Sequence, residues 1–244
     1  MKALWIVLLA TPLWAQVNIE HYRGKEGVTG GARLSLHSDI GNVDVVKSDG
    51  AGNLTVNTKT GTYLAVFKGV IGFLGGKRFA NSGVLHVRYT HTSNMHWQPE
   101  VFFQGDYAKS RRLDARMLLG AGMRRVWRAD KKNAFSLGSS LMWEREHLTL
   151  APDDRHPADT SVLRSSNYVN LLVGQRVSLS ITAYYQFALS DPSDVRLLGT
   201  SELTTPIWGR LKQTTAVDFR TDSNPPRGVK KTDVKLSTSF GVGF

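Results

Sequence analysis

The chain ends on the segment "VKLSTSFGVGF", residues 234–244, in which apolar residues alternate with small or polar ones. Alternation with a period of two is typical of a β-strand that has one apolar and one polar face. The apolar face would carry Val234, Leu236, Thr238, Phe240, Val242 and Phe244. A terminal strand frays unless hydrogen bonds hold both of its edges. The segment therefore predicts a sheet that closes on its last strand, by pairing this strand with the first.

Residues 1–15 have the pattern of a secretory signal peptide. Lys2 precedes an apolar run from Ala3 to Trp14, and polar residues follow Ala15. The run is shorter than the roughly 18 apolar residues of a membrane-spanning helix, which favours a cleaved signal over an anchor or a buried N-terminal helix. We therefore expect an exported protein, cleaved after Ala15, with residues 16–30 as an N-terminal periplasmic segment.

The composition restricts both the fold and the partners. Cleavage after residue 15 leaves 229 of the 244 residues, enough for one domain of barrel or sandwich size. The chain has no cysteine, so disulfides do not stabilise it. Its net charge is +11, but it carries no motif that binds nucleic acid. Anionic lipid head groups, phosphorylated glycolipid and small anions are the partners that this charge favours, and a charge-rich surface is the simpler explanation.

Period-two patterns recur along the whole chain, whereas helical periodicity is nearly absent. Leu85, Val87 and Tyr89, for example, alternate with the polar residues between them. The second strand is the weakest, because residues 50–52 interrupt it with glycine. The patterns predict an all-β fold of twelve strands at residues 31–40, 43–58, 61–73, 82–92, 97–107, 113–127, 134–147, 161–173, 176–188, 194–204, 209–221 and 232–244.

Polar and apolar residues alternate along the strands of both membrane barrels and soluble sandwiches, so this pattern does not distinguish the two folds. The lengths of the predicted connections do. The links after even-numbered strands are short. Most links after odd-numbered strands are longer, as at residues 75–82, 108–112, 148–160 and 223–232. Outer-membrane barrels have this asymmetry together with an even number of strands. We therefore predict a single antiparallel transmembrane β-barrel over residues 31–244, located in the bacterial outer membrane.

Aromatic residues fit the same interpretation. Trp97, Trp127 and Trp208 lie beside predicted short turns, where an interfacial girdle is expected, with ordinary core packing as the alternative. Phe240, Val242 and Phe244 belong to the closing strand, which we expect the barrel-assembly machinery to recognise.

Several segments resemble a known family. "RTDSNPPRGVKKTDVKLSTSFGVGF", residues 220–244, is similar to the C-terminal signature of a bacterial outer-membrane family classified as a domain of unknown function, some members of which are described as salt-induced outer-membrane proteins. "GNVD" at 41–44, "LGAG" at 119–122 and "LGSSLMWERE" at 137–146 also resemble its recurring segments. Residues 43–60 depart from the pattern, which leaves the register of the second strand open. The resemblance implies a barrel and carries no established active site.

Two groups of residues could form a catalytic or metal-binding site. "THTSN" contains His91 and Ser93, but a Ser/His pair needs a third orienting group, and the segment lies at a predicted turn. "APDDRHPAD", residues 151–159, offers carboxylates and an imidazole, but its spacing matches no defined calcium loop. A turn and a solvated loop are the simpler explanations. We therefore expect no catalytic residues, no metal site and no cofactor, and the protein is not predicted to be an enzyme.

A set of charged residues falls on the polar face of the fourth to seventh strands. Facing side chains on neighbouring strands lie within about 5 Å of each other, so this set could form a ladder of opposite charges in the lumen. The ladder could brace a filled interior or select ions and small solutes. Its predicted members are Arg88, Glu100, Gln104, Arg116, Glu144 and Glu146, with His86 beside them. Within the ladder, Arg88 and Arg116 would pair with Glu100 and Glu144.

Basic residues also cluster at the end of the barrel with the long loops. Lys77, Arg78, Arg111 and Arg112 contribute, as do three basic residues within 227–231. Glycolipid phosphates are natural counter-ions for such a cluster.

The sequence thus predicts an outer-membrane barrel that acts as a passive channel for small ions or solutes through a polar, anion-preferring lumen. A structural, non-conducting barrel for adhesion or envelope integrity is the alternative, and an outer-membrane hydrolase comes third. For the wet channel, replacing Arg116 with alanine should move ion selectivity toward cations and leave stability nearly unchanged.

Overall fold

A computed structural model of the chain describes residues 26–39, 44–130, 132–209 and 211–242. They form one antiparallel sheet of twelve strands in sequence order, which confirms the all-β prediction. No helix in these ranges is long and apolar enough to cross a membrane. The strands are β1 (Gly27–Asp39), β2 (Val45–Asn57), β3 (Gly61–Leu74), β4 (Lys77–His91), β5 (Trp97–Ala108), β6 (Leu113–Ala129), β7 (Asn133–Leu148), β8 (Asp159–Val173), β9 (Ser178–Ala188), β10 (Val195–Trp208), β11 (Leu211–Asp222) and β12 (Thr232–Val242), with a short 3-10 helix, η2 (Lys109–Arg111), between β5 and β6.

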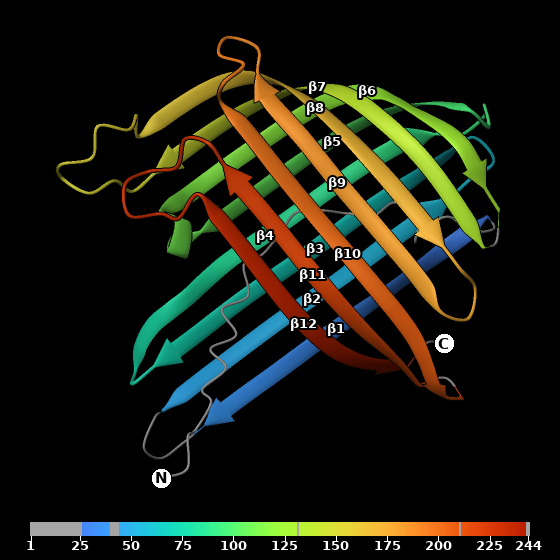
Figure 1. Ribbon diagram of the computed structural model, residues 1–244, viewed down its shortest axis with the longest axis horizontal. Coiled ribbons are helices and arrows are strands. Elements are labelled where there is room, and N and C mark those ends of the chain that lie inside the picture. Colours follow the sequence, from blue (N-terminus) through green and yellow to red (C-terminus); the bar gives the residue numbers. More distant parts are fainter. Residues whose placement is uncertain (1–25, 40–43, 131, 210, 243–244) are drawn as a thin grey trace.

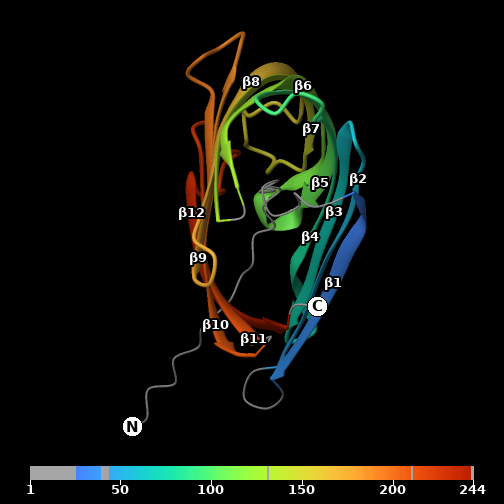
Figure 2. The same cartoon turned by 90° about the vertical axis from the view of Figure 1, so that its right-hand side faces the viewer.

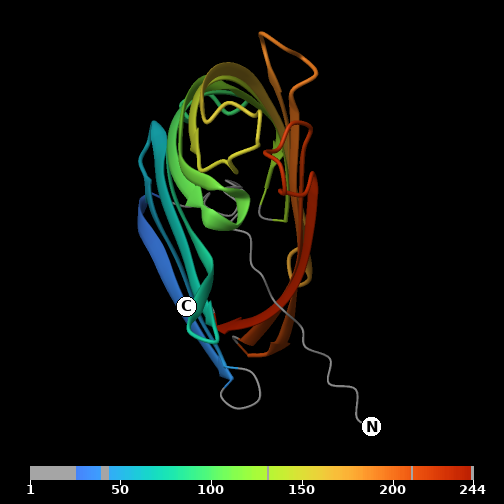
Figure 3. The ribbon, with the colours of Figure 1, turned by 90° about the vertical axis from the view of Figure 1, so that its left-hand side faces the viewer.

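The sheet curls around an interior. In Figure 1 its first strands cross behind its last strands, and Figures 2 and 3 show two facing walls, one of β1–β4 and the other of β9–β12, joined by β5–β8. The pairing of the described residues begins at β1 and ends at β12, and the C-terminal part of β12 bends toward β1 (Figures 2 and 3). Direct pairing between these two strands stays a prediction.

The two faces of the curled sheet have opposite chemistry. On β5, Val101 and Phe103 are 50% and 39% exposed on the outer face, whereas Glu100 and Gln104 are buried on the inner face. The same alternation runs along β7, where every second side chain from Ala134 to Leu148 is buried. Because successive side chains of a strand point to opposite faces, each strand contributes to both surfaces. The result is an apolar outside around a largely polar inside.

The three longest connections, residues 149–158, 189–194 and 223–231, all lie at the same end of the sheet. The long-loop end, at which the chain leaves β5, β7, β9 and β11, has connections of residues 109–112, 149–158, 189–194 and 223–231. The short-turn end, opposite, joins each even-numbered strand to the next. One predicted long connection is wrong: β4 begins at Lys77, so only Gly75 and Gly76 separate it from β3. Their positive φ angles of 53° and 74° suit a two-residue hairpin turn, which glycine forms without steric cost.

The second strand is continuous, in contrast to the predicted interruption at residues 50–52. It pairs in register with β1 and β3 along its whole length. The Phe67 ring of β3 lies over Gly52, where a Cβ would stand 2.3 Å from the ring. An aromatic ring that covers a glycine in this way restores packing that the glycine itself lacks. The register that the sequence left open is therefore fixed by a cross-strand contact.

The first strand begins at Gly27, so residues 27–30, predicted to lie in the N-terminal segment, belong to the sheet. The signal peptide at residues 1–15 lies outside the described residues. So do Phe244 and the side chains of Phe240 and Val242, although β12 itself reaches Val242.

Candidate functional site

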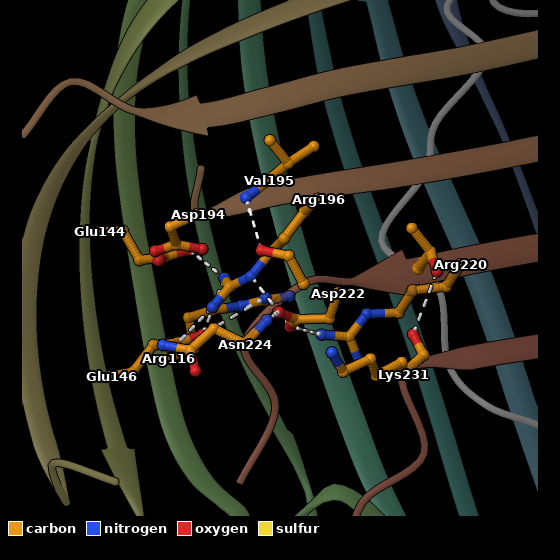
Figure 4. Close-up of polar contacts among 12 residues, drawn as sticks. Arg116, Glu144, Glu146, Asp194, Val195, Arg196, Arg220, Asp222, Asn224 and Lys231 are labelled. Atoms are coloured by element: carbon orange, nitrogen blue, oxygen red, sulfur yellow. Dashed lines mark hydrogen bonds and ion pairs between the residues drawn. The ribbon is translucent and has the colours of Figure 1, made fainter. Parts of the chain in front are cut away.

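The interior at the long-loop end is crossed by a group of charged side chains, here called the ion-pair network (Figure 4). At its centre is Glu144 of β7. One carboxylate oxygen accepts a hydrogen bond from Arg164 Nε at 2.7 Å, and the other accepts one from Arg196 Nη1 at 2.6 Å. The side chains of Glu144 and Arg164 are only 1% and 2% exposed. The network comprises Asp106, Arg116, Glu144, Glu146, Arg164, Asp194, Arg196, Arg220 and Asp222.

Arg196 connects strands that are not neighbours in the sheet. It reaches from β10 to Glu146 of β7, with two hydrogen bonds of 3.0 Å, and its Nε lies 3.1 Å from Asp222 of β11. Asp222 also accepts a hydrogen bond of 2.8 Å from Arg220. Strands β8 and β9 separate β7 from β10 in the sheet, so the contact of Arg196 with Glu146 spans the interior, whereas Arg196 and Asp222 face each other on the paired strands β10 and β11. Each buried charge thereby meets an opposite charge, as burial requires.

Arg116 joins the network through partners other than the one expected. The sequence paired it with Glu144, but its Nε donates to Asp106 at 3.1 Å and its Nη1 lies 3.6 Å from Glu146. The reason is the register of the sheet, which places Arg116 opposite Asp106 of β5 and Glu146 of β7, whereas Glu144 lies opposite Leu118. Its side chain is 11% exposed.

A second group, here called the aromatic cluster, lies nearer the short-turn end and consists of Arg88, Glu100, Phe102, Tyr168 and Tyr184. The Tyr168 hydroxyl of β8 donates to the Glu100 carboxylate of β5, 2.9 Å from each oxygen. The Arg88 guanidinium lies 5.3 Å and 5.6 Å from the ring centroids of Phe102 and Tyr168, close enough for cation–π attraction. Arg88 Nη1 is 3.5 Å from Glu100. The cluster therefore holds its one ion pair between aromatic rings.

Glycines on the inner face give these rings their positions. Gly120 of β6 is paired with Phe102, and Gly138 of β7 with Tyr168. A Cβ on either glycine would stand 2.2–2.3 Å from the facing ring. The rings can lie flat over the sheet only because these positions have no side chain. This accounts for two glycines in the segments "LGAG" and "LGSS".

A cavity of about 50 Å³ lies between the network and the aromatic cluster. Its charged lining residues are Arg88, Arg111, Arg116 and Arg220, and no aspartate or glutamate lines it. Arg111, which the sequence placed in a basic cluster for glycolipid, is thus directed to the interior. Burial, together with the neighbouring Arg220 and Arg116, lowers the pKa of the Arg111 guanidinium to about 9.

The three predicted interfacial tryptophans all lie at the short-turn end and face outward. Trp97 and Trp127 are about half exposed, and Trp208 is 85% exposed. The Arg125 guanidinium lies between Trp97 and Trp127, 4.6 Å and 5.4 Å from the ring centroids. This arrangement puts amphipathic rings and a cation at one rim of the apolar outer surface.

The longest loop, residues 149–158, contacts the loop of residues 223–231. Asp154 accepts a hydrogen bond of 2.8 Å from the backbone of Arg227, and Asp153 pairs with the Arg227 guanidinium. His156 Nε2 lies 3.2 Å from the carbonyl oxygen of Asn224. Within the described ranges no group of three or more histidine and acidic side chains could hold a metal ion. The loops 149–158 and 223–231 are therefore joined over the long-loop end.

The candidate Ser/His pair lies at the turn between β4 and β5. His91 Nδ1 is 3.0 Å from the Tyr89 hydroxyl, and no hydrogen bond among the described residues joins it to Ser93. Asn94 Oδ1 accepts hydrogen bonds from the backbone of His96 and Trp97, which is the side-chain-to-backbone contact of an Asx-type turn.

The six predicted ladder residues all lie on the inner face, but the sequence missed more than half of the site. A simple signal was available for all the missed residues except Asp194, which lies in the connection before β10, because each of the others has the inward parity of its strand. Extending that parity to the charged and aromatic residues of β5, β8, β9, β10 and β11 would have suggested them. The missed residues are Asp106, Arg164, Asp194, Arg196, Arg220 and Asp222 of the network and Phe102, Tyr168 and Tyr184 of the aromatic cluster.

A family model described as "Protein of unknown function, DUF481" matches residues 32–244. Since the match covers most of the chain, the chain belongs to this family. No curated protein and no solved structure matches it.

Proposed function

We propose that this DUF481 protein is an outer-membrane β-barrel whose lumen is closed by its own side chains and which stabilises the cell envelope as a structural component. The apolar outer face supports the membrane location, because so large an exposed apolar surface would aggregate in water but suits hydrocarbon. The outward tryptophans at one rim support it too, since such rings favour the interface between lipid and water. The signal peptide expected from the sequence would direct the chain there.

The observation that carries the closed lumen is the span of the ion-pair network. Glu144 and Glu146 on one wall bind Arg196 on another, and these side chains are almost fully buried. In a wide aqueous pore, water would separate and solvate such charges. Direct contacts of 2.6–3.0 Å leave no room for water between the carboxylates and the guanidinium. Such an interior suits a rigid structural barrel better than a channel that conducts ions or solutes.

A passive channel is the second candidate, favoured by the arginine-lined cavity between the two clusters. A planar-bilayer recording separates the two functions. We expect the purified barrel to show no steady conductance. We also expect Arg116→Ala to be destabilised by several kcal/mol, since it leaves the buried Asp106 with fewer partners. Steady conductance that becomes less anion-selective in Arg116→Ala, with stability unchanged, would establish the channel instead.

Location has its own test. We expect the chain to fractionate with outer membranes and to migrate faster on gels when unheated than when boiled, since a closed barrel stays compact in detergent. A chain that remains soluble without detergent would contradict the membrane assignment. We assign no enzymatic activity, and Ser93→Ala and His91→Ala are expected to leave envelope integrity unchanged.

A further inference from the structure

The cavity in the interior has an unusual charge distribution. Four guanidinium groups line it, from Arg88, Arg111, Arg116 and Arg220, and its remaining polar lining consists of amides, hydroxyls and one imidazole. Arg116 and Arg220 each have a carboxylate partner in the ion-pair network, but those carboxylates do not line the cavity. The space itself is therefore bordered by positive charge and by hydrogen-bonding groups. An anion is the ligand that such a border attracts.

Two buried atoms of the lining have no hydrogen-bond partner within the described part of the chain. They are Nε of Arg88 and Nε2 of His86. Each of these two residues is only 3% exposed. Buried polar atoms are nearly always satisfied, and an unsatisfied one costs about 1–3 kcal/mol. A bound ligand that can both accept and donate hydrogen bonds would satisfy both atoms.

The protonation of His86 follows from its neighbours. Gln104 donates its amide N–H to Asp106 at 2.8 Å, which leaves its carbonyl oxygen facing His86 Nδ1 at 3.1 Å. Nδ1 of the imidazole must therefore donate, and in a neutral ring Nε2 is then an acceptor. A ligand that meets both Arg88 and His86 needs acceptor oxygens for the guanidinium and one O–H for the imidazole. Hydrogen phosphate has both, whereas sulfate has no proton to donate.

Arg111 gives an independent reason to expect an anion. It belongs to η2 rather than to a strand, and among the described residues its side chain has no hydrogen bond or ion pair. Burial lowers its pKa most, and the neighbouring guanidinium groups lower the pKa further, against the smaller opposite effect of Asp106. An anion between these groups would remove the repulsion. Since η2 belongs to the connection between β5 and β6, this side of the cavity adjoins the long-loop end.

We propose that the interior cavity is a binding site for a small protonated oxoanion of the size of hydrogen phosphate, held by Arg88, Arg111 and Arg220, with His86 Nε2 accepting a hydrogen bond from its O–H group. The volume of about 50 Å³ corresponds to roughly three to five water positions, which is enough for one such ion and too little for a sugar or nucleotide. The site lies on the inner face, so free phosphate fits it better than a lipid phosphate, whose acyl chains must remain outside. The proposal does not depend on whether the lumen conducts.

The test is calorimetric titration of the full folded barrel in detergent with inorganic phosphate, at constant ionic strength and neutral pH. We expect saturable binding at one site, with at least tenfold weaker binding to Arg111→Gln. Arg111 is chosen because it lies outside the sheet and outside the ion-pair network, so the variant should fold. The matched control is Arg125→Gln, which removes the same charge from the outer face of β6 and should bind phosphate as the unchanged protein does.

Two further arms complete the experiment. Short-chain phosphatidic acid, offered in place of phosphate, should not compete for the site, and competition would overturn the assignment to free phosphate. Sulfate should bind several-fold more weakly, and equal binding would overturn the role given to His86. The site itself would be refuted by an absence of saturable phosphate binding, or by equal losses in Arg111→Gln and Arg125→Gln.

Discussion

The two halves of the interior are built from the same strands but are stabilised by different interactions. At the long-loop end, carboxylates and guanidinium groups of the ion-pair network contact each other directly, and several residues have two or three charged partners. Toward the short-turn end, the aromatic cluster surrounds a single ion pair with rings, and Tyr168 and Tyr184 pack against Leu64 and Val66 of the opposite wall. The stability of the first half therefore depends on the balance of opposite charges, and that of the second half depends on how closely its side chains pack.

The difference has an energetic consequence. Removing one member of a buried charged group leaves its partners without compensation, which costs more than the ion pair itself contributes. Removing part of an aromatic contact costs the lost packing and at most one hydrogen bond. Substitutions in the two halves should therefore lower the free energy of unfolding by different amounts. We expect the following order, from the largest effect to the smallest.

The largest loss of stability is expected for Glu144→Ala in the ion-pair network. This change leaves Arg164 and Arg196 each without one carboxylate contact in a buried site, at a cost of about 3–5 kcal/mol. Urea unfolding of the barrel in detergent or lipid vesicles measures the difference. Arg145→Ala, on the exposed outer face of the same strand, is the control and should change the unfolding free energy by less than about 1 kcal/mol. Equal effects would remove the distinction between the network and the surface.

A smaller loss is expected for Tyr168→Phe in the aromatic cluster. The ring stays, but the Glu100 carboxylate loses a hydrogen bond in a buried place, which costs about 1.5–3 kcal/mol. Tyr185→Phe makes the same chemical change on the outer face of β9, where the side chain is 45% exposed, and should be nearly neutral. If unfolding experiments gave the two tyrosine variants the same stability, the cluster would not depend on its hydrogen bond.

A comparable or smaller loss, about 1–3 kcal/mol, is expected for Gly138→Ala, which tests the fit of the Tyr168 ring. The added Cβ would meet the ring at 2.2 Å, so the ring must move from its position above the strand. Gly69→Ala is the matched control, because nothing lies within 4 Å of a Cβ there and its φ needs no glycine. We expect that variant to be neutral or slightly stabilised. Thermal unfolding of both variants in one detergent decides the comparison.

The smallest effect is expected in the two joined loops, 149–158 and 223–231, whose contact should depend on pH. The backbone N–H groups of His156 and Arg227 hold the pKa of the Asp154 carboxyl below its usual 3.8. A lowered pKa stabilises the contact at pH values above 3.8, and this stabilisation is lost as the pH falls through the pKa of the folded protein. Protease sensitivity of residues 223–231 should therefore rise below about pH 4, with unfolding of the barrel unaffected. Asp154→Asn should show the raised sensitivity already at neutral pH.

The strands could be predicted because their signal is local. A period of two is visible within a few residues, so all twelve strands were found, and the main errors lie at strand ends. The start of β4 was missed because Lys77 and Arg78 resemble a loop by charge, although Gly75 and Gly76 form the actual turn. The inward position of the ladder residues followed from the same period.

The contacts of those residues could not be predicted in the same way. Neighbouring strands suggested Arg116 with Glu144, but the register of the sheet places Arg116 opposite Asp106 of β5 and Glu146 of β7. Arg196 was missed altogether, because its partners Glu144 and Glu146 lie 52 and 50 residues away on a strand that is not adjacent. Strand pairing says which residues are neighbours within the sheet. It says nothing of which meet across the interior.

By itself, the sequence determined the number of strands, the face on which each side chain lies and the end at which the long loops gather, because each of these depends on residues close together in the chain. The tertiary structure alone decided that the interior charges join opposite walls, that rings rest on Gly120 and Gly138, and that four arginines border one cavity. These features depend on how far the sheet curls and how its strands are staggered. Curvature and stagger are properties of the whole sheet, summed over all of its strands, and no single segment encodes them.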